Sequence, residues 1–147
     1  MTTVLCFGTF DGLHPGHDDF LRQARALGDR VVVVIALDIT VLTVKGQLPA
    51  NSEEERRKMV AMHRHVDEAV LGREDDKHAI IEHIRPDVIL LGYDQEHFTQ
   101  DLEQHLSERG VRATILRGES FEPEKWKTSL LREPEKDAED VEVGLPL

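Results

Sequence analysis

The sequence predicts an α/β fold, a Rossmann-like parallel five-stranded sheet with helices on both faces. Segments rich in β-branched and aliphatic residues alternate along the chain with segments whose apolar residues recur at helical spacing. The run Val31–Leu37 is continuously apolar, which is typical of a strand covered on both faces. Strict alternation of strand and helix favours parallel strands joined by right-handed crossovers. We expect the strand order 3-2-1-4-5.

The first elements are predicted from short local signals. A strand is expected over Val4–Phe7. A helix is expected to begin at Pro15, because proline is acceptable at the first helical position, and to end at Gly28. Val31–Leu37 forms the second strand, and Lys45 falls in a loop that follows it. The apolar face of the first helix consists of Phe20, Leu21, Ala24 and Leu27.

The later elements follow the same alternation. Ser52 and Glu55 have the spacing of a capping box, so a helix is expected to begin between them. The remaining expected elements are a strand over 66–71, a helix over 77–84, a strand over 87–91, a helix over 98–109, a strand over 112–116 and a helix over 125–132.

Length and charge limit the possible functions. The 147 residues fit one domain, which we expect over residues 1–132, followed by an acidic, flexible tail over 133–147. A net charge of -11 argues against nucleic acid as a partner, because that affinity rests on neutralising phosphates. The chain shows no secretory signal and no membrane-spanning run, so we expect a cytoplasmic protein without a membrane partner. A single cysteine, Cys6, is expected to be a buried, inert thiol.

The stretch GTFDGLHPGH follows the first strand and predicts an anion site. Gly8 and Gly12 let the backbone turn sharply and approach a ligand closely. His14 and His17 are three residues apart, so they share one face of the first helical turn. That turn carries unpaired N–H groups and the positive end of the helix dipole, which together favour a phosphate group.

Neighbouring residues in the stretch fit the same reading. Gly16 removes a side chain that would crowd a bound group, and Thr9 can donate a hydrogen bond. Asp11 does not favour a phosphate, and a metal ion or a substrate hydroxyl suits it better. Two alternatives remain open: a zinc site formed by Asp11, His14 and His17, and a tight turn whose histidines are incidental.

At these residues the chain resembles the cytidylyltransferase-like nucleotidyltransferase superfamily. His14-Pro15-Gly16-His17 fits the family's histidine-x-glycine-histidine motif, and GTFD stands in front of it at the family's spacing. Later blocks also look like the family's: EERRKMV over 54–60, RHVDEAVLG over 64–72 and PDVILLGYDQ over 86–95. The resemblance extends over about 130 residues of this chain.

The resemblance implies an enzyme that moves a nucleoside monophosphate from a nucleoside triphosphate to a phosphate-bearing acceptor and releases pyrophosphate, usually with Mg²⁺. The catalytic residues that it implies are His14, His17, Lys45 and Arg57. The implied nucleotide-binding residues are Gly8, Thr9, Phe10, His14, Gly16, His17, Asp94, Lys127, Thr128 and Ser129. The implied acceptor-binding residues are Asp11, Asp38, Arg64 and Tyr93, and Asp11 is also the implied metal ligand.

Structural readings compete at several of these positions. Arg56 is expected on a solvated helix face, whereas Arg57 is expected to bind phosphate. Lys45 suits either solubility or a phosphate clamp. Arg64 either contacts the acceptor or forms an ion pair with Asp67. Tyr93 suits core packing equally well, and the histidines outside the motif are expected at the surface. These are His63, His65, His78, His83, His97 and His105.

Within the superfamily, the chain resembles archaeal-type FAD synthases most, which use ATP and FMN. The stretches LDITV, VKG, EERRKMV and LLGYDQ support this. Leu37 departs from the arginine expected before Asp38 in that family. RHVDEAV also resembles glycerol-3-phosphate cytidylyltransferases, which use CTP, and this alternative stays open. Lys127 stands where the family often has a small hydroxyl residue, which leaves open a nucleotide-binding module without turnover. The resemblance also implies a homodimer.

Overall fold

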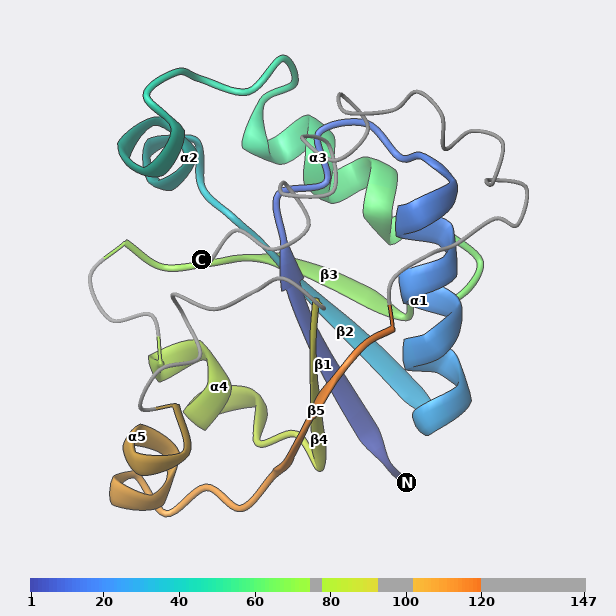
Figure 1. Ribbon diagram of the computed structural model, residues 1–147, viewed down its shortest axis with the longest axis vertical. Helices are drawn as coiled ribbons and strands as arrows, with labels where there is room; N and C mark the ends of the chain where they lie inside the picture. Colours follow the sequence, from blue (N-terminus) through green and yellow to red (C-terminus); the bar gives the residue numbers. More distant parts are fainter. Residues whose placement is uncertain (75–77, 93–101, 120–147) are drawn as a thin grey trace.

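A computed structural model describes residues 1–74, 78–92 and 102–119 of the chain (Figure 1). Its strands form one parallel sheet in the order β3-β2-β1-β4-β5, which confirms the predicted fold and strand order. The strands are β1 (Thr3–Gly8), β2 (Arg30–Ile35), β3 (Glu68–Leu71), β4 (Val88–Leu91) and β5 (Thr114–Arg117). The helices are α1 (Pro15–Leu27), α2 (Asp38–Lys45), α3 (Glu53–Ala61), α4 (Ala79–Ile84) and α5 (Leu102–Glu108).

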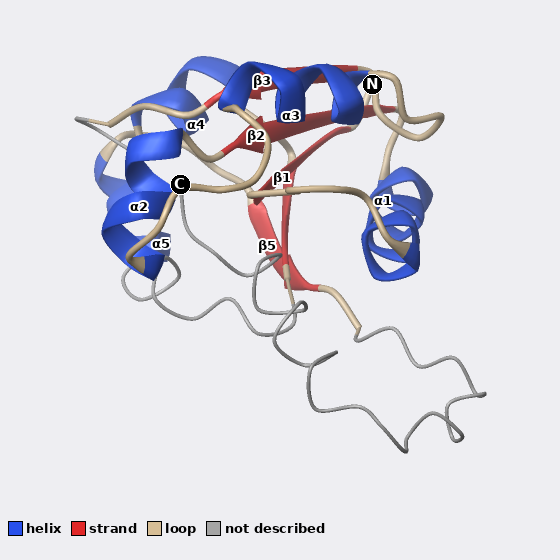
Figure 2. Ribbon diagram, turned by 90° about the horizontal axis from the view of Figure 1, so that it is seen from above, coloured by secondary structure: helices blue, strands red, loops and turns tan. Residues whose placement is uncertain are grey.

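Helices cover both faces of the sheet, and each face has its own apolar core (Figures 1 and 2). Alternate residues of a strand point to opposite faces, so Cys6 packs with α1 and α3 while Leu5 and Phe7 pack with α4 and α5. Cys6 is buried as expected, and burial raises the pKa of its thiol. No helix within the described ranges is long and apolar enough to cross a membrane.

The register of the sheet brings the carboxyl ends of β1 and β2 to the same level. Gly8 pairs with Ile35, and the amide of Ala36 donates to the carbonyl of Gly8 at 2.9 Å. The winding direction of the sheet reverses between β1 and β4. In sheets of this kind, ligands bind beyond the carboxyl ends of the strands at that reversal. The loop between β1 and α1 is therefore placed where this architecture holds its ligand.

Two helix starts form as the sequence predicts. Pro15 is the first residue of α1, and the helix ends at Leu27 with Gly28 after it. At α3, Ser52 Oγ accepts from the amide of Glu55, and Glu55 Oε1 accepts from the amide of Ser52. This capping box satisfies two amides that helix geometry leaves without partners.

The prediction that Lys45 lies in a loop is wrong, because Lys45 is the last residue of the unpredicted helix α2. The sequence DITVLTVK is rich in β-branched residues, which have low helix propensity and concealed the helix. Tertiary contacts support it: the amide of Asp38 donates to Glu53 Oε1 at 2.7 Å. Gly46 then ends α2 in a left-handed conformation, with φ of 85°.

Some expected elements fall partly or wholly outside the described residues. The described parts of the helices expected over 77–84 and 98–109 are α4 and α5. The helix expected over 125–132 and the tail over 133–147 lie outside the described ranges.

Candidate active site

The loop after β1 and the first turn of α1 carry three polar side chains, Thr9, His14 and His17, that are buried or partly buried. Thr9 and His17 are almost completely enclosed, with relative exposures of 1% and 0%. His14 is the residue immediately before α1 and is partly buried. The rings of His14 and His17 stack with centroids 3.7 Å apart, so the two imidazoles lie side by side at the start of the helix.

Backbone hydrogen bonds fix the tautomers of both histidines. His14 Nδ1 accepts from the amide of Gly16 at 3.0 Å, and His17 Nδ1 accepts from the amide of His14 at 3.3 Å. A neutral imidazole has one nitrogen that accepts and one that carries hydrogen. We therefore assign the hydrogen of each ring to Nε2.

Three buried polar atoms of this loop have no hydrogen-bond partner among the described residues: Thr9 Oγ1, His14 Nε2 and His17 Nε2. A buried polar atom without a partner costs about 1–3 kcal/mol, so a cluster of three requires an explanation. All three can donate hydrogen. We refer to them as the donor cluster, and an anion with several oxygens, such as a phosphate, is the ligand that suits it.

The donor cluster attracts an anion without carrying a full charge on His17. Burial, with a smaller contribution from neighbouring His14, lowers the pKa of His17 to about 3 and outweighs a backbone hydrogen bond with Gly12 that acts in the opposite direction. His17 is therefore a neutral N–H donor near pH 7. The positive end of the 13-residue helix α1 reinforces the attraction.

The buried side chain of Phe10 supports the β1–α1 loop. It is fully buried, its ring centroid lies 5.0 Å from that of His17, and its backbone φ is 51°. A left-handed conformation costs a non-glycine residue roughly 1–2 kcal/mol. Gly8 is required by close approach, since a Cβ there would lie 2.5 Å from Phe10 Cε2. Glycine therefore makes room for the ring that supports His17.

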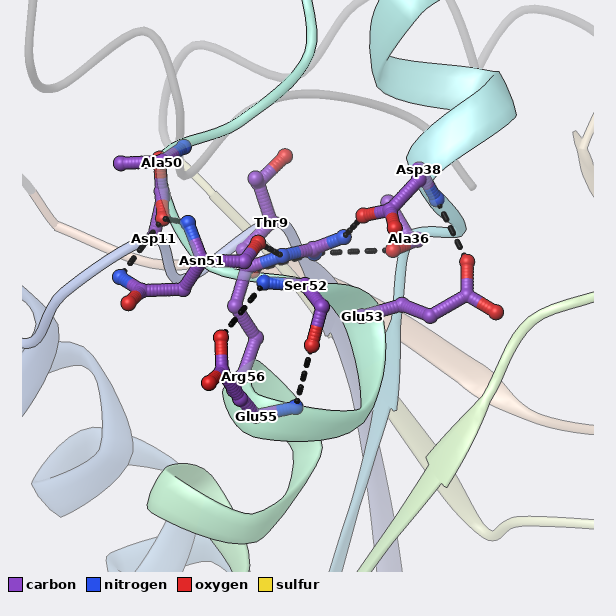
Figure 3. Close-up of polar contacts among 10 residues, drawn as sticks. All are labelled: Thr9, Asp11, Ala36, Asp38, Ala50, Asn51, Ser52, Glu53, Glu55 and Arg56. Carbon is purple, nitrogen blue, oxygen red and sulfur yellow. Dashed lines mark hydrogen bonds and ion pairs between the residues drawn. The ribbon is translucent and has the colours of Figure 1, made fainter.

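Both carboxylate oxygens of Asp11 accept hydrogen bonds from other residues of the protein. Its oxygens accept from the amides of Ala50 and Asn51, at 2.7 and 2.9 Å, and from Asn51 Nδ2 at 3.0 Å (Figure 3). Partial burial opposes ionisation of Asp11, but these three bonds and nearby Arg56 outweigh it and hold the pKa below its usual value. These contacts fasten the loop to the segment that precedes α3.

The described residues do not form a resident metal site. Asp11, the predicted metal ligand, has both oxygens in hydrogen bonds to Ala50 and Asn51. In the described part of the chain, no group of three or more His, Cys, Asp or Glu side chains could hold a metal ion. This arrangement also disfavours the zinc alternative, which required Asp11 beside His14 and His17.

Comparison with known proteins identifies the family. Residues 5–134 match the sequence model of the family described as cytidylyltransferase-like. The chain belongs to the cytidylyltransferase-like family.

Curated relatives with similar sequences are named FAD synthase. The protein from Methanosarcina barkeri is 50% identical over 117 residues, which are 80% of this chain and 83% of that protein. The protein from Halorhabdus utahensis is 45% identical over 123 residues, covering 84% of this chain and 85% of that protein. A solved structure from Thermoplasma volcanium, described as a lipopolysaccharide core biosynthesis protein, has a TM-score of 0.78 and 34% identity, and covers 83% of this chain and 99% of that one.

The structure brings together the predicted residues of this family's N-terminal motif. They lie at the end of β1, in the β1–α1 loop and in the first turn of α1: Gly8, Thr9, Phe10, Asp11, His14, Gly16 and His17. It places Asp38 at the start of α2, beyond the end of β2. The predicted site residues Tyr93, Asp94, Lys127, Thr128 and Ser129 lie outside the described residues.

Two further residues that the resemblance implies, Arg57 and Arg64, are paired with carboxylates of the protein. Arg57 pairs with Glu54 at 2.6 Å and approaches the carbonyl of Ala69 on β3, the edge strand. Arg64 is exposed and faces Asp18 of α1 at 3.4 Å. Of the two readings left open for Arg64, the ion pair with Asp67 does not form, because Arg64 faces Asp18 and Asp67 pairs with Arg25.

Asp67 and His63 hold structural positions. Asp67 pairs with Arg25 at 2.7 Å and accepts from the amide of Val31. The expectation of a surface histidine fails at His63, whose side chain is 9% exposed and lies 2.8 Å from Asp18. Sequence spacing alone did not reveal either contact.

Arg56 is the site residue that sequence reasoning missed. It is 0% exposed, so the prediction of a solvated helix face is wrong. The signal was present, because Arg56 precedes the buried Val60 by one helical turn and so shares its inward face. Arginine is normally expected at the surface, and the residues that bind this one come from distant parts of the sequence.

Proposed function

We propose that the chain is a nucleotidyltransferase that transfers AMP from ATP to FMN, forming FAD and releasing pyrophosphate. The observation that supports this most is the donor cluster, since Thr9, His14 and His17 present three buried donors without partners in the described chain. The curated relatives named FAD synthase support the choice of ATP and FMN.

The proposed reaction is a displacement at the α-phosphorus of ATP. An oxygen of the FMN phosphate attacks that phosphorus, the bond to the β-phosphate bridging oxygen breaks, and pyrophosphate leaves with the bond's electron pair. Negative charge shifts onto the leaving phosphates, and donors placed beforehand stabilise it. In this proposal His14 Nε2, His17 Nε2 and Thr9 Oγ1 donate to phosphate oxygens, and no proton is transferred by either histidine.

We propose that the nucleotide enters as its magnesium complex. Mg²⁺ commonly binds proteins through substrate phosphates with few protein ligands. That mode suits a described chain in which Asp11 is already engaged by Ala50 and Asn51. The substrate form is then MgATP.

Several predicted contacts remain part of the proposal. A phosphate that reaches Arg57 or Arg64 has to compete with Glu54 or Asp18, which pair with these arginines. Asp38 stands beyond the end of β2, where an acceptor contact is possible, and Lys45 closes the same helix. We also propose that the protein is a homodimer and is located in the cytoplasm. Light scattering on the purified protein tests the homodimer.

The test is pyrophosphate release with Mg²⁺ present, using ATP or CTP, each combined with FMN or glycerol 3-phosphate. We expect release from ATP with FMN, matched by chromatographic detection of FAD, and none when FMN is omitted. Release from CTP with glycerol 3-phosphate would move the assignment to a polyol-phosphate cytidylyltransferase. Thermal stabilisation by ATP without release in any mixture would indicate a binding module.

A further inference from the structure

Arg56 of α3 binds four residues from three segments at the carboxyl edge of the sheet (Figure 3). Its Nη1 donates to the carbonyls of Thr9 and Ala36, each at 2.9 Å. Its Nε donates to the carbonyl of Asn51 at 3.0 Å, and its Nη2 donates to Asp38 Oδ1 at 2.7 Å. One guanidinium therefore fixes the ends of β1 and β2 relative to the starts of α2 and α3.

The bond to Thr9 acts on a strained peptide. The Thr9 carbonyl belongs to the peptide that joins Thr9 to Phe10, and Phe10 has a left-handed φ of 51°. Such a conformation persists only where surrounding contacts impose it. Arg56 holds the peptide on one side, while the Phe10 ring packs near His17 on the other.

Asp11 fastens the far side of the same turn. It binds the amide and the side chain of Asn51, whose carbonyl accepts from Arg56. The loop over 9–11 is therefore tied to the start of α3 at both ends. Without these ties the Thr9 hydroxyl and the His17 ring would have other orientations available.

Packing alone does not account for an arginine at this position. A buried cation loses its hydration, and an apolar side chain of similar volume often serves a core as well or better. Val60, one turn further along α3, packs into the same core without any polar group. The feature that only a planar guanidinium supplies is a fan of donors aimed at several oxygens.

We propose that Arg56 is a positioning residue for nucleotidyl transfer, which orients the Thr9 hydroxyl and supports His17 through the Thr9 carbonyl. Arg56 is fully buried, so we assign it a role through its neighbours and not a contact with substrate. This inference rests on the function proposed above. Small misplacements of reacting or charge-stabilising groups cost about 100-fold in rate, so loss of this support should be visible in turnover.

The first test is Arg56→Lys, which keeps the charge but not the planar fan of donors. We expect kcat for FAD formation to fall about 10- to 100-fold, while KM for ATP and for FMN changes by less than about threefold. The matched control is Arg30→Lys, because Arg30 pairs with Glu68 at the opposite end of β2 and β3. A kcat for Arg56→Lys within about threefold of the control would overturn the proposal.

A double-mutant cycle with Thr9→Val separates positioning from general destabilisation. If Arg56 acts through the Thr9 hydroxyl, the two substitutions are not independent. The kcat of the double variant is then higher, by about fivefold or more, than the value obtained by multiplying the two single effects. Effects that multiply fully would contradict the proposal. A merely structural role predicts full multiplication, since it reduces the folded fraction whether or not the hydroxyl is present.

Asp38→Asn serves if Arg56→Lys does not fold. It weakens the bond to Arg56 Nη2 at a carboxylate whose side chain is 32% exposed, so the core is left intact. The same cycle with Thr9→Val then applies, and non-multiplying effects on kcat support the proposal. Multiplying effects would contradict it, as would a change confined to KM for FMN.

The inference and the proposed function can fail separately. If the wild-type protein makes no FAD, the proposed function fails, and the cycle is run on binding of inorganic pyrophosphate by calorimetry. Arg56→Lys should then weaken pyrophosphate binding, and the loss of affinity in the double variant with Thr9→Val should be smaller than the product of the two single losses. Unchanged binding, or fully multiplying effects, would overturn the role of Arg56.

Discussion

At the scale of single residues, the site depends on donors that the protein itself does not satisfy. Thr9, His14 and His17 each have one buried polar atom without a partner in the described chain, while Asp11 and Arg56 have several partners. The first three are suited to a ligand, and the other two hold the loop in shape. The motif histidines could be predicted from the sequence because His14 and His17 stand at helix-turn spacing. Arg56 could not, because Thr9, Ala36 and Asp38 come together only in the fold.

Thr9→Val should separate stability from function. Valine has the shape of threonine and removes a buried hydroxyl without a partner, so we expect the unfolding free energy to stay level or rise by about 1 kcal/mol. Turnover should fall about 10- to 100-fold, because one donor to phosphate is lost. Thermal unfolding and pyrophosphate release measure the two effects. Reduced stability with unchanged turnover would show that the hydroxyl has a structural partner instead.

His17 should make stability depend on pH. Its pKa is about 3 in the folded protein, below the ordinary value of 6.5, so the unfolded chain takes up a proton first. The contribution of neutral His17 to the free energy of unfolding is complete above pH 6.5. It is lost as the pH falls towards 3, at up to about 1.4 kcal/mol per pH unit. Urea unfolding across this range, compared with His17→Gln, measures it. Equal pH slopes for both proteins would contradict the burial of a neutral His17.

At the scale of elements, the sequence predicts helix starts and buried strands where neighbouring residues alone determine them. Pro15 and Ser52 mark helix starts, and the apolar run of β2 marks a buried strand. Helix α2 escaped prediction because its β-branched residues favour strands and no side chain caps its start. Its first amide is instead satisfied by Glu53, fifteen residues later. A bond of that kind cannot be read from the sequence.

Ser52→Ala should weaken the start of α3, which holds Arg56 in place. Loss of the cap leaves the amide of Glu55 without its partner, and we expect the unfolding free energy to fall by about 1 kcal/mol. The control is Ser107→Ala, at an exposed position of α5, where alanine should be neutral or slightly stabilising. Equal stabilities for the two variants, measured by urea unfolding, would remove the cap's contribution.

At the scale of the whole molecule, an acidic chain offers a site suited to an anion. The net charge is -11, and Arg56, Arg57 and Arg64 each face a carboxylate. In the described structure, attraction for phosphate therefore comes mainly from the donor cluster and the start of α1. The sheet order was predictable from the alternation of strands and helices. The pairing of arginines with acids was not, because it depends on which surfaces meet.

Deleting residues 134–147 tests the predicted domain limit. The sequence predicts that the domain ends near residue 132, so we expect the shortened protein to retain the melting temperature and FAD formation of the full chain. Loss of activity with an unchanged melting temperature would show that the acidic segment contributes to the site. Loss of both would place the domain boundary further along the chain.

FAD formation by the wild-type protein and by His17→Ala, measured together with MgATP and FMN, tests the proposed function and the donor cluster most directly. We predict FAD formation by the wild type and a loss of about 100- to 1,000-fold in His17→Ala, as expected on removing one charge-stabilising donor. His83→Ala, at an exposed position of α4, should match the wild type. Near-normal turnover in a folded His17→Ala would contradict the role of the donor cluster, and no FAD from the wild type would contradict the proposed function.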